Sequence, residues 1–60
     1  MLTIDDIVCR LNDGLDRTEH ELAKCKKCLL EYQHKNNMTL KELDDLCFAD
    51  SDWIFEYIFG

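Results

Sequence analysis

The stretch IDDIVCRLNDGLDRTEHELAKCKKCLLEY, residues 4–32, repeats apolar or small side chains at alternating spacings of four and three positions. A heptad pattern of this kind is typical of a helix that packs along another helix at a shallow angle. We therefore predict one long helix over residues 4–35. Its predicted seam, the stripe that would face the other helix, consists of Ile4, Val8, Leu11, Leu15, Leu22, Cys25, Leu29 and Tyr32, with the small Thr18 in the gap.

The segment Asn12-Asp13-Gly14 offers an alternative within the same stretch. On its own it is typical of a turn, and Thr18 with Glu21 would then cap a second helix. We favour the continuous helix because the apolar spacing keeps its register across Gly14, whereas a turn has no reason to preserve it. One glycine inside a helix costs only about 1 kcal/mol relative to alanine.

Polar residues mark both ends of this predicted helix. Thr3 and Asp6 have the spacing of a capping arrangement at its start. The segment KNNMT, residues 35–39, supplies the stop, because Asn36 or Asn37 can adopt the left-handed conformation that ends many helices.

The rest of the chain predicts two short helices. Thr39 and Glu42 form a capping box at the start of one over residues 40–48, and the nearly all-apolar segment DWIFEYIF predicts another over residues 52–59. The alternation of Trp53, Phe55, Tyr57 and Phe59 would also suit a strand, but a single terminal strand would have nothing to pair with. Proline is absent and only two glycines occur, so few residues break helices. The predicted fold is all-α, a single small domain over residues 1–60, packed as a helical bundle or as an antiparallel coiled-coil dimer.

The composition is that of a chain that folds in water. It is 47% hydrophobic and 33% charged, too apolar for simple disorder and too charged for a membrane protein. A chain of 60 residues buries only about 60% of its unfolded surface, so we expect help from a metal, disulfides or a second subunit.

The ends and the charge of the chain bear on its location and partners. No apolar run approaches the roughly 18 residues of a transmembrane span, and the opening MLTIDDIVCR carries acids where a secretory signal has basic and apolar regions. We expect a cytoplasmic protein whose four cysteines are reduced. The net charge of −6 argues against direct binding to nucleic acid or to an anionic membrane.

Charge alternates along the chain. Residues 1–21 and 42–60 are acidic, while residues 22–41 carry five lysines and one glutamate. An antiparallel pair of long helices would set the acidic residues 5–21 of one chain against the basic residues 24–35 of the other. We therefore predict an antiparallel homodimer, with a monomeric helical hairpin as the alternative.

The pair Cys25 and Cys28 has the Cys-x-x-Cys spacing of a zinc half-site. On a helix, however, His20 and His34 point away from the two thiols, and no second cysteine pair completes the site. A redox pair would need its first cysteine at the start of a helix. We interpret both cysteines as helix-packing residues and predict no metal and no cofactor, with a zinc-binding protein as a low-ranking alternative.

The sequence also lacks the features of an enzyme. Asp5 with Asp6 and Asp44 with Asp45 are adjacent, so their carboxylates diverge on a helix and cannot work as a pair. There is no glycine-rich phosphate loop, and 60 residues leave little room for a water-excluding cleft. We predict that the chain is not an enzyme.

The aromatic end of the chain predicts a binding surface. It holds more apolar side chains than one helix face can hide, and tryptophan and tyrosine dominate interface hot spots. The predicted partner-binding residues are Trp53, Phe55, Tyr57, Ile58 and Phe59 with the acids Asp50, Asp52 and Glu56.

These features favour a small acidic interaction module, a regulator or inhibitor that binds a partner protein of unknown identity. The alternative is a nucleic-acid mimic, a rigid acidic rod that occupies the DNA- or RNA-binding groove of a target enzyme. No motif in the chain assigns it to a family.

Overall fold

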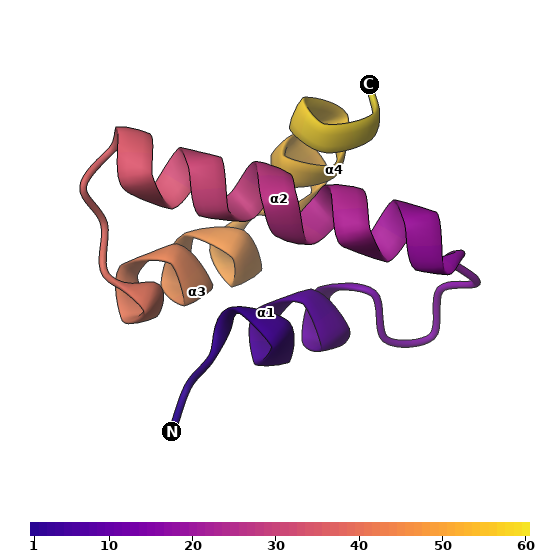
Figure 1. Ribbon diagram of the computed structural model, residues 1–60, viewed down its shortest axis with the longest axis horizontal. Coiled ribbons are helices and arrows are strands. Elements are labelled where there is room, and N and C mark those ends of the chain that lie inside the picture. The colour runs from indigo at the N-terminus through magenta and orange to yellow at the C-terminus, as the bar shows by residue number, and fades with distance from the viewer.

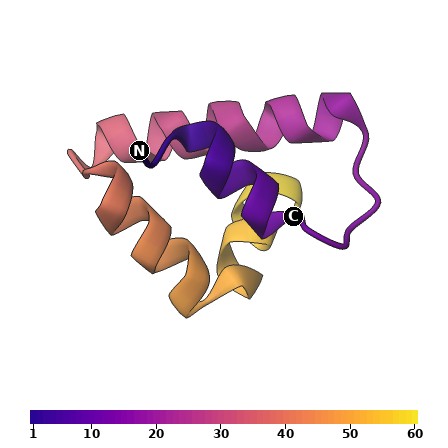
Figure 2. The same ribbon diagram turned by 90° about the horizontal axis from the view of Figure 1, so that it is seen from below.

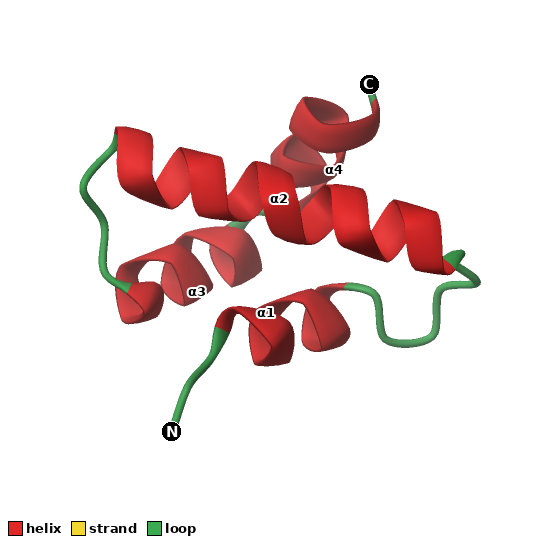
Figure 3. Ribbon diagram, viewed as in Figure 1, coloured by secondary structure: helices red, strands yellow, loops and turns green.

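The computed structural model describes residues 1–60 and contains four helices and no strand (Figures 1 and 3). The helices are α1 (Ile4–Leu11), α2 (Glu19–Lys35), α3 (Leu40–Ala49) and α4 (Ser51–Phe59). The predicted all-α class is confirmed, and α3 and α4 each agree within one residue with the two short helices expected from the sequence. None of the four helices combines the length and the apolar character needed to cross a bilayer.

The prediction of one continuous helix over residues 4–35 is wrong. The chain leaves the helical conformation after Leu11, and Gly14 has a left-handed backbone with φ of 78°. A new helix then starts from a capping box, in which the Thr18 hydroxyl accepts from the Glu21 N–H at 3.2 Å and the Glu21 carboxylate accepts from the Thr18 N–H at 3.0 Å. The turn alternative at Asn12-Asp13-Gly14 is therefore the correct one.

The physical reason for the break is burial. A single long helix would leave its apolar stripe in water unless a second chain covered it. With a loop at residues 12–18, α1 folds back along α2 and buries Ile7, Val8 and Leu11 within the same chain. Gly14 and Thr18 reduce the free-energy cost of that chain reversal, because a capping box stabilises its helix by about 1 kcal/mol.

The first three helices begin in the same way. In each, a threonine hydroxyl accepts a backbone N–H three residues later, and the acid at that position accepts the threonine N–H in return. The pairs are Thr3 with Asp6, Thr18 with Glu21 and Thr39 with Glu42. The predicted left-handed stop is at Asn37, with φ of 51°. Only α4 starts without a side-chain cap, at Asp50.

The longest helix, α2, forms one side of the molecule. In Figure 2 it runs along the top, and α1, α3 and α4 all lie below it. The core lies between them and draws on every helix. Its nine buried residues are Ile7, Val8, Leu11, Cys25, Leu29, Leu43, Cys47, Ile54 and Ile58.

Most residues of the predicted seam are buried in the core of this one chain or pack against it. Its buried members Val8, Leu11, Cys25 and Leu29 belong to the core. Three others, Ile4, Leu22 and Tyr32, pack against the edge of the core. Leu15 departs from the pattern, because it lies in the loop and is 47% exposed. The seam therefore does not form a continuous face on one helix, and the coiled-coil geometry predicted for it is wrong.

Replacing Gly14 with alanine tests the turn. The residue holds a left-handed φ of 78°, and a Cβ added there meets no atom within 4 Å, so backbone strain is the only penalty. We expect Gly14→Ala to lower the free energy of unfolding by about 1 kcal/mol in urea denaturation. Gly14→Asn is the control, because asparagine tolerates this conformation and should cost less. Equal stability of Gly14→Ala and the natural chain would contradict the assigned turn.

Candidate partner-binding surface on the last helix

The inward stripe of α4 is aliphatic. Ile54 and Ile58 stand one turn apart and are 0% and 4% exposed. They close the core against the other helices. The inclusion of Ile58 among the partner-binding residues is therefore wrong, because its side chain is not accessible to a partner.

Two aromatic side chains on one flank of α4 pack against α2. The rings of Trp53 and Tyr57 lie 5.5 Å and 5.6 Å from the ring of Tyr32, centroid to centroid, and 6.2 Å from each other. Tilted and edge-on arrangements at these distances are favourable for aromatic pairs. This aromatic triad, Tyr32, Trp53 and Tyr57, attaches α4 to the carboxyl-terminal half of α2.

The other flank of α4 is held by cations. Phe55 and Phe59 stack with their centroids 6.5 Å apart, and the Arg17 guanidinium lies 5.2 Å and 4.4 Å from the two ring centroids. The Lys24 ammonium is 5.7 Å from the ring of Phe59. Such cation–π contacts contribute about 0.5–1 kcal/mol each at exposed sites. They fasten α4 to the 12–18 loop and to the start of α2.

Most of the aromatic surface that was predicted to bind a partner thus packs against other parts of this chain. Trp53, Phe55 and Phe59 are half-buried in the contacts described above, whereas Tyr57 is 50% exposed. The structure also exposes 41% of Phe48 on α3, with the Arg10 guanidinium 4.5 Å from its ring. Sequence reasoning missed Phe48, although its position directly after the buried stripe of α3 could have indicated an outward ring.

The acids of α4 have no cationic neighbour. Asp50, Asp52 and Glu56 are exposed, and none lies within 4.0 Å of a lysine, arginine or histidine nitrogen. The ion pairs of the chain lie elsewhere and are Arg10–Asp44, Arg17–Glu21, Lys26–Asp5 and Lys41–Asp45. Together with Tyr57 and the outer edge of Trp53, these three carboxylates form what we call the α4 surface.

The cysteine pair singled out in the sequence lies on the inner side of α2. Cys25 is fully buried, Cys28 is half-buried, and the Asn12 side-chain amide approaches the Cys25 sulfur at 3.8 Å. Burial raises the pKa of the Cys25 thiol, which disfavours the thiolate that binds metals or attacks disulfides. No group of three or more histidine, cysteine or acidic side chains is arranged to hold a metal ion.

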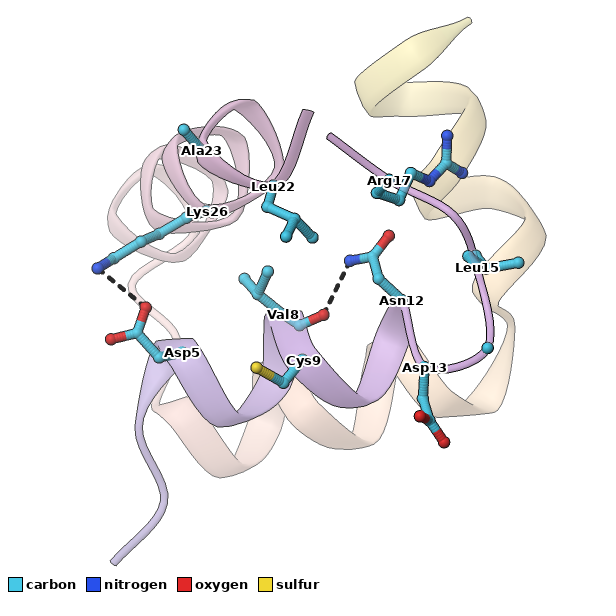
Figure 4. A pocket seen from close by; sticks show the side chains of 11 residues that line it. Asp5, Val8, Cys9, Asn12, Asp13, Leu15, Arg17, Leu22, Ala23 and Lys26 are labelled. Atoms are coloured by element: carbon cyan, nitrogen blue, oxygen red, sulfur yellow. Dashed lines mark hydrogen bonds and ion pairs between the residues drawn. The ribbon is translucent and has the colours of Figure 1, made fainter. Parts of the chain in front are cut away.

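A groove of about 680 Å³ opens between α1, the 12–18 loop and the start of α2 (Figure 4). The Asp5–Lys26 ion pair, 3.0 Å long, borders it, and its walls include Val8 and Leu22. Asn12 donates from its side-chain amide to the Val8 carbonyl at 2.8 Å. Its lining also includes the carboxylates of Asp5 and Asp13 and the exposed thiol of Cys9.

Comparisons with protein-family models, with curated proteins and with solved structures find no match to this chain. Function is therefore inferred from the exposed side chains and charges of the fold itself. Of the surfaces described, the α4 surface is the one that collects residues predicted from the sequence, unpaired charge and an exposed ring in one place.

Proposed function

We propose that this chain is a small protein-interaction module, a regulator or inhibitor that acts by binding a partner protein through the α4 surface. The observation that carries the proposal is the set of unpaired carboxylates Asp50, Asp52 and Glu56 beside the half-exposed ring of Tyr57. Uncompensated charge steers a partner of opposite sign, and tyrosine contributes a large contact area at low entropic cost.

The chemistry of this surface favours a basic partner. Asp52 and Glu56 stand one helical turn apart, so both carboxylates can meet arginine or lysine side chains on one partner surface. An arginine there can also stack on the ring of Tyr57, in the way that Arg17 both stacks on Phe59 and pairs with Glu21 within this chain. We therefore propose a partner protein with an arginine-rich surface.

The expected homodimer remains a prediction. Since much of the predicted seam lies in the core, a dimer would have to use another surface of the molecule. Sedimentation equilibrium at micromolar concentration measures whether it forms.

A variant that alters only exposed side chains tests the α4 surface. We expect the triple variant Tyr57→Ala, Asp52→Asn, Glu56→Gln to lose a protein that the natural chain retains from its host lysate. Loss of a tyrosine hot spot alone weakens binding by about 2 kcal/mol, roughly 30-fold. The measurement is affinity capture with quantitative mass spectrometry, followed by titration of the purified partner.

The control for this experiment is a variant of Lys41 and Asp45, an exposed pair on α3, changed to Gln and Asn. Circular dichroism must show both variants folded. Retention of the partner by the triple variant would contradict the proposal. Competition by DNA for the same partner would instead support the nucleic-acid mimic, although the broken helix removes the rod on which that alternative was based.

A further inference from the structure

The side of α2 that faces away from the core carries a second stripe of residues at helical spacing. In Figure 2 no helix lies above α2. Ala23, Lys27, Leu30 and His34 follow one another at spacings of four, three and four along this side. Leu30 is half-buried and the other three are exposed. The two apolar members, Ala23 and Leu30, are seven residues apart and so lie on the same side of the helix.

This side of α2 has an apolar centre between basic residues. A shallow depression of about 620 Å³ lies over Ala23 and Leu30, with Lys27 and Lys35 beside it. Ala23 is small, so it allows the backbone of a second helix to approach closely. Leu30 offers an apolar contact at the next level of the stripe.

The lysines of this face are free to pair with another molecule. Lys27 and Lys35 lie within 4.0 Å of no carboxylate, whereas Lys26 at the edge is paired with Asp5. A partner carboxylate can therefore approach Lys27 and Lys35 without first breaking an ion pair within this chain.

We propose that this open face of α2, formed by Ala23, Lys27, Leu30 and His34 with Lys26 and Lys35 on its two flanks, binds an acidic amphipathic helix of a partner protein. The stripe supplies the helix-on-helix spacing, and the unpaired lysines select glutamate or aspartate on the flanks of the partner. Lys27 lies within the stripe itself, so the partner needs an acid opposite it, and that requirement fixes the register.

Charge favours a helix over a polyanion. The chain carries a net charge of −6, which repels nucleic acid and anionic lipid at long range. Glu31 lies on the same side of α2, beside the depression, and would face a phosphate backbone. A helix with a few spaced acids carries less charge than a polyanion, so it meets less of that repulsion, and its position opposite Glu31 can be uncharged. Its leucine stripe also uses the apolar centre. This face is also opposite in charge to the α4 surface, so the two surfaces take different partners.

A designed peptide serves as the probe. It is a dye-labelled helix of about three heptads with leucine opposite Ala23 and Leu30, glutamate opposite Lys27 and glutamate on both flanks. We expect saturable binding to the full chain by fluorescence anisotropy and none by a scrambled peptide of the same composition. Lys27→Glu should weaken binding about 10-fold, since one attraction is replaced by a repulsion. Lys41→Glu on α3 is the matched control and should change affinity less than about twofold.

Four results would overturn the proposal. They are equal affinity for the scrambled peptide, an unchanged affinity in Lys27→Glu, tighter binding of a DNA duplex or of phosphatidylglycerol vesicles, and self-association that Lys27→Glu abolishes. The last would assign the face to a second copy of this chain. The triple variant of the α4 surface should bind the peptide as the natural chain does. The two binding proposals are therefore tested independently, and a negative result for one does not contradict the other.

Discussion

We expect Leu29→Ala to lower the free energy of unfolding by about 2–5 kcal/mol, which is most of the stability that a domain of this size has at room temperature. Leu29 is fully buried in the core, where it is among the largest side chains without any exposure. The lost methyl groups leave a cavity that a small domain cannot easily close. Because a core of this size rarely supplies more than about 3–5 kcal/mol, one such change removes most of the net stability.

The adjacent residue provides the control. Leu30 has the same chemistry on the same helix but lies on the open face of α2, so Leu30→Ala should cost less than about 1 kcal/mol. Urea denaturation followed by circular dichroism compares the two variants directly. Similar losses for both would mean that α2 is rotated about its axis relative to the described fold.

Alkaline pH destabilises the fold through Cys47. Burial raises the pKa of this thiol from 9.0 to about 11, with smaller contributions from Cys25 and Asp44. The unfolded chain releases the proton near pH 9 whereas the folded chain keeps it until about pH 11, so proton loss favours unfolding between these values. The stability is fully present below pH 9 and falls by about 2–3 kcal/mol towards pH 11.

Urea denaturation below pH 9 and again near pH 11 measures this loss. Burial raises the pKa of Cys25 as well, so the two thiols act in the same direction. Cys47→Ala keeps a small apolar side chain but cannot ionise, and its stability should fall less steeply over the same range. An equally steep fall in Cys47→Ala would show that other groups dominate the alkaline transition.

The helical class, the two short helices and the capping boxes at Thr3 and Thr39 follow from residues close together in the sequence. The break at Gly14 and the capping box at Thr18 also have local signals, but they belong to the alternative that we did not favour, and the length of the loop explains why. Residues 12–18 number seven, the length of one heptad, so the apolar spacing before the loop continues after it without a change of phase. Periodicity alone therefore cannot distinguish a continuous helix from two helices joined by such a loop.

The sequence indicates the aromatic segment as a candidate site but does not indicate which of its side chains are exposed. The segment from Trp53 to Phe59 is almost uniformly apolar, so no pattern says which side chains face inward. In the fold the aliphatic pair Ile54 and Ile58 turns inward and the rings lie on the flanks. That outcome depends on Arg17 and Tyr32, which approach α4 only after the chain has folded.

The repeated threonine caps have a consequence for the rate of folding. Each joins residues only three positions apart, so these helix starts can form transiently in the unfolded chain without help from distant segments. Helical domains dominated by local contacts fold in microseconds to milliseconds. α4 has no such side-chain cap, so we expect its docking to be the slow step and Trp53 fluorescence to report it.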